Sequence, residues 1–298
     1  MFFINGSYVS ETDAKISVLD LSILRGFGVF DYLRTYSGKP FHLSEHLLRL
    51  QYSAQQLGLE LPYTLEKISE IINEVLRLNQ LAEASIKIIA TGGISPDQFT
   101  PQHPATLIVF AYPLASYPPE YFTKGINVVT TRLMRSMPSC KTTQYIPGII
   151  ALQQGRSSNA KEALYVNAKG EILEATTSNF FGVKEGKLYT CMSEEVLAGI
   201  TREVVLKIAK GQFPICFEPI AIDEIDQLDE AFITASNKEV MPVVAIDSTP
   251  IGSGKVGPIT TQAMSLFRNY TKQDNWPLLD IPRYAAVLQT SDIQLLKK

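Results

Sequence analysis

The chain has 298 residues and a formal net charge of -3, from 27 Lys and Arg against 30 Asp and Glu. That balance, with no local run of basic residues, gives no electrostatic footprint for binding nucleic acid. The start of the chain is apolar only over residues 1–4, and no later apolar run approaches the length of a membrane helix. We therefore expect neither nucleic acid nor a membrane as a partner, and a cytoplasmic location. A chain of this length normally forms two domains.

The first part of the chain is expected to contain hairpin strands and two helices. The Asn5-Gly6 pair predicts a tight hairpin turn. One helix should begin with Ser44 as its N-cap and close at Gly58. A second helix should run from Thr64 to about Asn79.

Two strands, over 85–91 and 106–112, should complete this small N-terminal domain, which we place at 1–115. The proline-containing stretch at 116–121 is typical of an interdomain linker. The remainder, 122–298, should form a larger C-terminal domain. Its expected elements are a strand at 126–131, a helix after Pro147, hairpin strands over 163–190, a helix from Thr201, strands near Ala231 and Val243, and a helix after Pro258.

Two further patterns do not indicate a binding site. The glycines of 252–257 have the spacing of a dinucleotide fingerprint, but too little chain follows for the strand and helix that it needs, and Pro258 comes directly after it. The three cysteines lack CxxC spacing and the three histidines lack a metal-ligand pattern, so we expect neither a disulfide framework nor a metal. Cys140 is interpreted as a buried small residue.

Lys141 and Glu174 are the most informative residues of the sequence. Lys141 lies in Ser139–Tyr145, and Glu174 precedes Ser178-Asn179. An amine can hold the aldehyde of pyridoxal phosphate as a Schiff base, and an acid can keep the pyridine nitrogen protonated so that the ring accepts electrons. One lysine alone would carry little weight, since most lysines are solvated surface groups. The pair suggests a pyridoxal phosphate enzyme.

Segments from Asn5-Gly6 to about Thr260 resemble the fold-type IV pyridoxal phosphate enzymes. This family holds branched-chain aminotransferases, D-amino acid aminotransferases and aminodeoxychorismate lyase. The matching segments occur in the family's order at 25–31 (RGFGVFD), 46–50 (HLLRL), Lys141, Glu174 with 178–180 (SNF), 197–202 (LAGITR), 232–243 (FITASNKEVMPV) and 254–258 (GKVGP). The resemblance implies an α/β (α+β) fold of two domains, with the cofactor at the domain interface, and a homodimer.

The resemblance also assigns groups to the cofactor. Ile200 and Thr201 match the family's phosphate-binding turn, at a helix start whose N–H groups would face a dianion. On its own this turn would be a plain helix cap. Arg49 matches the family's phosphate-binding arginine, with an exposed helical arginine as the alternative. Ser236 matches a second phosphate turn, where threonine is common. Tyr145 could donate to the cofactor's phenolic oxygen, although one more residue usually separates it from the lysine, and a tyrosine packed in the core is the alternative.

Substrate binding requires a cation or several donors for the α-carboxylate. Arg25 and Arg34 lie around Phe30, in a segment that lines the pocket of the family's dimers, and Lys87 is a third candidate cation. Asn237 belongs to the turn that the family uses for phosphate and carboxylate. The chain departs from both family patterns, because 91–96 lacks the arginine of many D-amino acid enzymes. Branched-chain enzymes usually have tyrosine and arginine where this chain has Arg25 and Lys87.

The sequence therefore predicts a homodimeric pyridoxal phosphate aminotransferase of class IV. It would move an amino group between an α-amino acid, branched-chain or D-configured, and a 2-oxo acid, with Lys141 carrying the α-proton to the cofactor. Two alternatives remain open. A lyase of the aminodeoxychorismate type would release pyruvate by elimination. A noncatalytic protein that binds pyridoxal phosphate would need no proton-carrying lysine.

Overall fold

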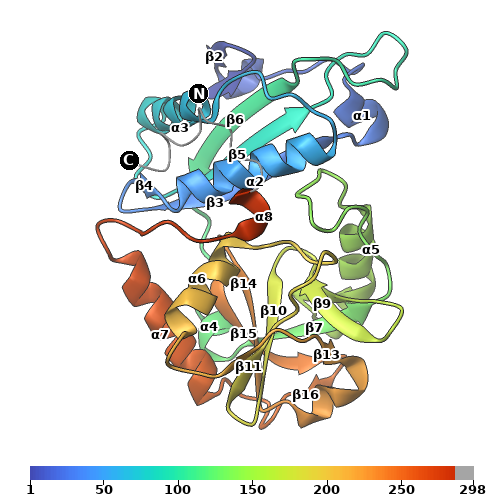
Figure 1. Ribbon diagram of the computed structural model, residues 1–298, viewed down its shortest axis with the longest axis vertical. Coiled ribbons are helices and arrows are strands. Elements are labelled where there is room, and N and C mark those ends of the chain that lie inside the picture. Colours follow the sequence, from blue (N-terminus) through green and yellow to red (C-terminus); the bar gives the residue numbers. More distant parts are fainter. Residues whose placement is uncertain (286–298) are drawn as a thin grey trace. The chain divides into compact units, whose positions relative to one another are not determined.

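The computed structural model describes residues 1–285, which form two compact units (Figure 1). Of the described residues, unit 1 comprises 1–115, 140–144 and 276–285, and unit 2 comprises 116–139 and 145–275. Residues 286–298, at the end of the predicted C-terminal domain, lie outside the described residues. The domain boundaries drawn from the sequence stay predictions.

The described part of unit 1 has a six-stranded sheet in the order β2-β1-β6-β5-β3-β4. Asn5 and Gly6, with φ of 43° and 93°, form the tight turn between β1 and β2, so the predicted hairpin is confirmed. Strands β3, β5 and β6 pair antiparallel over long stretches at the centre. The strands are β1 (Phe2–Ile4), β2 (Ser7–Val9), β3 (Gly28–Tyr36), β4 (Lys39–Pro40), β5 (Ala84–Thr91) and β6 (Thr106–Pro113).

Two long helices cover this sheet: α2 (Leu43–Gln56) contacts β3, and α3 (Leu65–Leu78) contacts β6 and β1. Thr64 caps α3 by accepting a hydrogen bond from the Lys67 amide, as predicted. The expected N-cap of α2 is wrong. That helix is preceded by His42 at φ 50°, whose ring bonds to Glu45 at 2.8 Å and secures the first turn, so Ser44 already lies inside the helix.

The shorter helical elements of unit 1 are η1 (Glu11–Asp13), α1 (Leu21–Arg25) and α8 (Pro282–Ala285). Two segments far along the chain also belong to this unit. Residues 140–144 lie along the start of β3, where the Phe30 amide donates to the Lys141 carbonyl at 2.9 Å. Residues 276–279 pack against α2 and the residues before it, because the Leu279 amide donates to Glu45 at 2.9 Å and the Trp276 ring lies 4.8 Å from that of Phe41.

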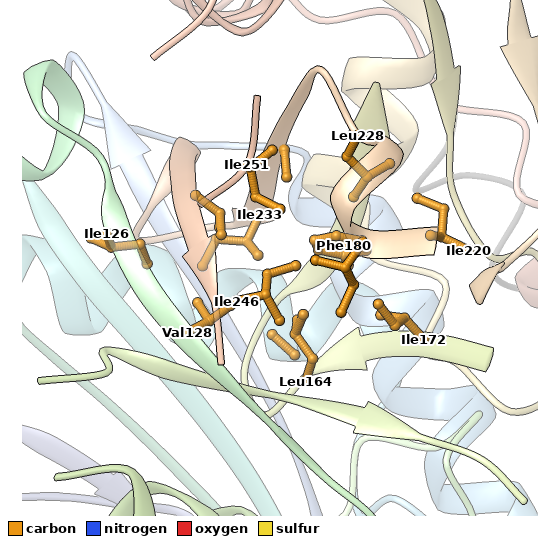
Figure 2. Packing of buried hydrophobic residues seen from close by; sticks show 14 of the residues in the cluster. Ile126, Val128, Leu164, Ile172, Phe180, Ile220, Leu228, Ile233, Ile246 and Ile251 are labelled. Carbon is orange, nitrogen blue, oxygen red and sulfur yellow. The ribbon is translucent and has the colours of Figure 1, made fainter. Parts of the chain in front are cut away.

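Unit 2 is built on a larger sheet, six strands of which close on themselves. The order β10-β14-β15-β7-β8-β9 returns to β10 through a further pairing with β9. The strands are β7 (Ile126–Thr131), β8 (Glu162–Val166), β9 (Glu171–Ala175), β10 (Asn179–Lys184), β11 (Lys187–Tyr189), β12 (Ile215–Cys216), β13 (Ile220–Ala221), β14 (Glu230–Ala235), β15 (Glu239–Ile246) and β16 (Thr249–Pro250). Side chains from all six closing strands form one buried core, which Figure 2 shows around Leu164, Phe180 and Ile233.

The helical elements of unit 2 are α4 (Glu120–Thr123), α5 (Ile146–Gln154), η2 (Gly155–Ser158), α6 (Ile200–Ala209), η3 (Ile222–Gln227) and α7 (Pro258–Thr271). Pro258 occupies the first turn of α7, as expected. With two sheets and many helices, the structure confirms the predicted α/β (α+β) class. Within residues 1–285, no helix is long and apolar enough to cross a membrane.

Candidate active site

Lys141 of unit 1 is held by hydrogen bonds to both of its main-chain polar groups. Its amide donates to the Ser53 hydroxyl of α2 at 3.0 Å, and its carbonyl accepts from Phe30 of β3 at 2.9 Å. The ammonium lies 4.8 Å from the centre of the Phe30 ring. Two secondary-structure elements thus fix the point from which the Lys141 side chain extends.

The Phe30 ring contacts a second ammonium, that of Lys87, also 4.8 Å from the ring centre. Lys87 pairs with Tyr32 across β3 and β5, so it is a diagonal neighbour of Phe30 on the sheet. Burial lowers the pKa of Lys87. Among residues 1–285, no acidic side chain forms an ion pair with it. A partly buried cation of this kind can accept an anionic group from outside the protein.

Arg49 on α2 is fully buried and forms a two-point ion pair with Asp31 of β3. Its Nε lies 2.8 Å from Oδ2 and its Nη2 lies 2.8 Å from Oδ1, while His46 bonds to the same carboxylate at 2.6 Å. Burial would raise the pKa of Asp31, but Arg49 and His46 hold it well below its usual range. The alternative of an exposed helical arginine is therefore wrong. The phosphate role of Arg49 stays a prediction.

In unit 2, Glu174 at the end of β9 is buried and receives several hydrogen bonds. Arg135 donates to Oε1 at 2.5 Å, and the Asn179 side chain and the Leu197 amide each donate to Oε2 at 3.1 Å. Burial alone would lower the pKa of Arg135, but Glu174 and Tyr145 raise it. A neighbouring guanidinium and hydrogen-bond donors favour the charged form of a carboxyl group, and a carboxylate is the form that can hold a proton on a pyridine nitrogen.

Asn179 connects this acid to the start of α6. Its side-chain amide also donates to the Leu197 carbonyl at 2.8 Å, and a Cβ at Gly199 would overlap Asn179. Gly199 is the N-cap of α6 and supplies no side chain to cap the helix. Ile200 and Thr201, both buried, form the first turn, so the helix N-terminus is suited to a phosphate.

The remaining predicted residues of unit 2 lie on other turns. Ser236 and Asn237 follow β14, and the Asn237 side chain donates to the Tyr117 hydroxyl at 3.0 Å. Tyr145 precedes α5 as its N-cap residue and is half-buried. The roles of all three stay predictions.

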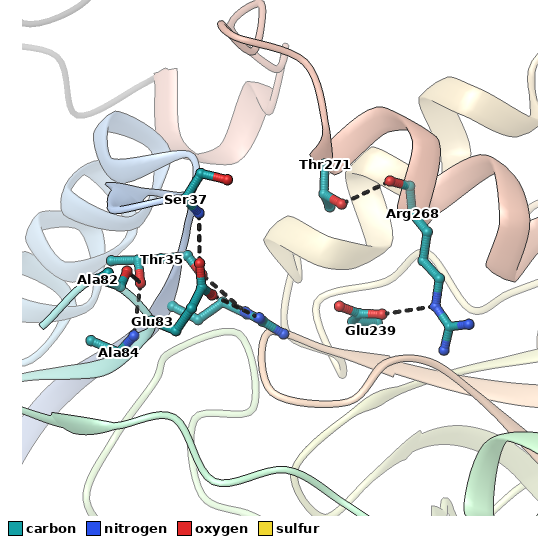
Figure 3. Close-up of polar contacts among 9 residues, drawn as sticks. Thr35, Ser37, Ala82, Glu83, Ala84, Glu239, Arg268 and Thr271 are labelled. Atoms are coloured by element: carbon teal, nitrogen blue, oxygen red, sulfur yellow. Dashed lines mark hydrogen bonds and ion pairs between the residues drawn. The ribbon is translucent and has the colours of Figure 1, made fainter. Parts of the chain in front are cut away.

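Arg25 and Arg34 have different surroundings from Lys87. Arg25 ends α1, is exposed, and donates to the neighbouring Leu24 carbonyl at 3.0 Å. Arg34 lies four residues beyond Phe30 on β3, over the Tyr36 ring and 3.3 Å from Glu83. Glu83 in turn accepts from the Ser37 amide (Figure 3). Of the three predicted cations, Lys87 is the one beside the ring that Lys141 contacts.

Several polar residues around these groups were not singled out in the sequence. Arg135, Ser53, Glu162 and Lys238 are all buried, and each meets a partner far away along the chain. Glu162 opens a strand that is otherwise apolar, so a charged residue at a core position was the one available hint.

The residues present fit pyridoxal phosphate. A carboxylate paired with arginine suits the ring nitrogen, and the uncapped start of α6 suits the phosphate. Two buried hydroxyls of unit 2, those of Tyr165 and Thr234, have no hydrogen-bond partner within residues 1–285, and burial raises the pKa of Tyr165 to about 12. Those residues contain no cluster of His, Cys, Asp and Glu that could hold a metal ion.

Comparison with known proteins identifies the family to which the chain is similar. The sequence model of the family described as Amino-transferase class IV matches residues 28–246. A putative branched-chain-amino-acid aminotransferase of Methanocaldococcus jannaschii is 34% identical over 276 residues, covering 90% of this chain and 95% of the relative. D-alanine aminotransferase of Staphylococcus epidermidis is 34% identical over 275 residues, covering 90% and 96%. The structure of the T.th. branched-chain amino acid aminotransferase with pyridoxamine 5′-phosphate matches with a TM-score of 0.86 at 29% identity, covering 97% of each chain.

Proposed function

The chain belongs to the class IV aminotransferase family, and we propose that Lys141 is the residue through which it transfers the amino group. It is a pyridoxal phosphate-dependent transaminase, which moves an amino group between an α-amino acid and a 2-oxo acid. The bound cofactor supplies a ring that withdraws electrons from the α-carbon of the substrate. The anchoring of both main-chain polar groups of Lys141 carries the proposal, because it fixes where the amine starts.

Each functional group of the chain has one task. Lys141 Nζ would take the proton from the α-carbon of the substrate and act as the base that carries it during the transfer. Glu174 would hold the proton on the ring nitrogen, with Arg135 as its ion-pair partner. The phosphate is assigned to Arg49, Ile200, Thr201 and Ser236, and the phenolic oxygen to Tyr145.

Lys87 is assigned to the α-carboxylate of the substrate. It is the predicted cation that lies beside Phe30 and lacks an acidic partner among the described residues, whereas Arg34 is paired with Glu83 and Arg25 is exposed. Phe30 would flank the same substrate, and Asn237 would contribute a donor from its turn. A cation that is already desolvated loses little further hydration when it binds a carboxylate.

The test compares Lys87→Met with Arg25→Ala and Arg34→Ala. Loss of the charged hydrogen bond between Lys87 and the α-carboxylate should cost about 2 to 4 kcal/mol of transition-state stabilisation, because the site is desolvated. The value of kcat/KM for an amino acid should therefore fall roughly 30- to 1000-fold. Turnover of a simple primary amine, which has no carboxylate, should change far less. A larger amino-acid-specific loss in Arg25→Ala would transfer the role to Arg25.

The reaction and its substrate are tested together by mixing the purified yellow enzyme with L- and D-amino acids. Loss of the visible absorbance with one amino acid, and its return with a 2-oxo acid, is the expected result for a transaminase. Relatives act, by name, on branched-chain amino acids or D-alanine, so both sets are included. Release of pyruvate without any 2-oxo acid acceptor would contradict the proposal and favour elimination.

The enzyme is proposed to act as a homodimer. Apolar side chains are exposed on α5 and on the loop before Lys141, and Ile146 is 69% exposed. The group comprises Leu133, Met134, Met137, Ile146, Ile149 and Ile150. Exposed apolar side chains that flank the catalytic lysine in sequence suit an interface with a second copy. A cytoplasmic location belongs to the same proposal, and its support is that all three cysteines are free thiols.

Ile149→Lys tests the dimer, with Phe217→Lys, also at an exposed apolar residue of unit 2, as the control. A lysine at the interface should shift the enzyme toward monomer in light scattering and lower its activity on dilution, while the control stays dimeric. A fully active monomer would refute the dimer as the working form.

A further inference from the structure

Glu162 is a fully buried carboxylate at the start of β8 that organises the turn between β9 and β10. It accepts hydrogen bonds from three consecutive hydroxyls, those of Thr176, Thr177 and Ser178. This turn joins Glu174, the last but one residue of β9, to Asn179, the first of β10. The geometry of the strand end that carries Glu174 therefore depends on Glu162.

The charge partner of Glu162 comes from a different turn. Lys238 follows Ser236 and Asn237 after β14, is buried, and lies 2.7 Å from Glu162 and 2.6 Å from the Thr177 hydroxyl. Beside it, Asn237 donates to the Tyr117 hydroxyl. Lys238 thus joins the turn after Glu174 to the turn that contains Ser236.

Both groups of the pair are charged. Burial alone would raise the pKa of Glu162 and lower that of Lys238. The opposite charge of the partner, together with hydrogen bonds, outweighs burial in both cases, so the pKa of Glu162 is lowered and that of Lys238 is raised. Replacing a buried ion pair by apolar residues of similar volume often leaves a protein equally stable or more stable. Stability alone therefore does not explain why this chain has the Glu162–Lys238 pair. A pair with fixed hydrogen bonds does, however, hold two turns in a defined geometry.

We propose that Glu162 and Lys238 are positioning residues of the transaminase reaction, which set the separation between the Glu174 strand end and the Ser236–Asn237 turn. The inference rests on the proposed roles of Glu174 and Ser236. Neither residue of the pair needs to touch cofactor or substrate. They act through the two turns, so that the acid for the ring nitrogen and the donors for the phosphate fit one cofactor molecule at once.

Three variants separate positioning from plain stability. Lys238→Met removes one charge and leaves Glu162 buried and unpaired, so it should lower both Tm and activity. The double variant Lys238→Met/Glu162→Gln removes both charges, which should restore much of the Tm. Thr177→Val removes the hydroxyl that contacts both partners and leaves the ion pair in place. Lys184→Met is the matched control, because it breaks a partly exposed Lys–Glu pair with Glu224 in the same unit.

The measurements are the Tm of the holoenzyme, the Kd of pyridoxamine phosphate, and kcat and KM. If the pair positions the two turns, the double variant should regain its Tm while its kcat/KM stays about 10- to 100-fold below that of wild type and its Kd stays above it. The reason is that small displacements of reacting groups have large effects on rate. Thr177→Val should show the same pattern more weakly, and Lys184→Met should match wild type. If the activity and Kd of the double variant recover together with its Tm, the pair is merely structural. If wild type itself does not transaminate, the proposed function fails instead.

Discussion

Arg135 and Glu174 form a buried ion pair, with the Arg135 Nη2 2.5 Å from the Glu174 Oε1. The pair joins the loop after β7 to the end of β9 within unit 2. A carboxylate next to a guanidinium resists protonation, and it can then stabilise a protonated pyridine nitrogen. With the role proposed for Glu174, the protonation of the cofactor ring would depend on both residues, and Arg135 would act through Glu174.

Glu174→Gln should keep the cofactor bound while slowing proton transfer about 100-fold, because the amide cannot hold the ring nitrogen protonated. Stopped-flow absorbance of a single half-reaction measures that step, and Glu185→Gln, on an exposed turn of the same unit, serves as the control. Arg135→Lys should give a smaller loss, since it retains the positive charge but not the planar guanidinium. A normal half-reaction rate in Glu174→Gln would remove Glu174 from the mechanism.

Lys141→Ala should abolish the visible absorbance of the bound cofactor and lower turnover by about 1000-fold, because the group that carries the α-proton is lost. The fold should survive, as shown by an unchanged far-UV circular dichroism spectrum. Lys67→Ala, at an exposed lysine of unit 1, is the control and should behave as wild type. Transamination by Lys141→Ala at the wild-type rate would mean that another lysine is the base.

Ser53→Ala tests the anchor of Lys141. The substitution leaves the partly buried Lys141 amide without its acceptor at 3.0 Å, at a cost of about 1 to 3 kcal/mol in the free energy of unfolding. If the anchor also positions the amine, kcat should fall while KM for the 2-oxo acid changes little. Ser85→Ala, which removes a longer bond of 3.5 Å to a carbonyl of β6, should leave both unchanged. Equal kinetics in the two variants would limit Ser53 to a structural role.

Asp31→Asn should destabilise the protein by about 3 to 5 kcal/mol at pH 7, because Arg49 would be left buried without its charge partner. The folded pKa of Asp31 is depressed, so its contribution to stability is present above the unfolded pKa of about 4 and is lost as the pH falls toward the folded value. The difference in the free energy of unfolding between wild type and Asp31→Asn should therefore become smaller as the pH falls from about 5 to about 2. Urea unfolding across that range measures it, and a constant difference would show that the pair is not linked to this titration.

Local sequence determined the elements whose signals lie within a few residues. The Thr64 side chain caps α3 by bonding to the amide three residues later, Asn5-Gly6 forms the turn of the first hairpin, and Pro258 lies in the first turn of α7. These features depend on backbone dihedrals and hydrogen bonds between neighbours, which a short stretch of chain specifies by itself. The N-cap of α2 was missed because the His42–Glu45 contact, and not the serine inside the helix, secures its first turn.

The sequence also determined which chemistry the chain carries, since Lys141, Glu174 and the turn at Ile200 occur in motifs that are recognisable in order. Their supporting residues were decided by the tertiary structure. Arg135 meets Glu174 across 39 positions, Glu162 meets Lys238 across 76, and Ser53 meets Lys141 across 88. A buried charge or amide must find a partner, but only the path of the chain through two sheets decides which residue that partner is.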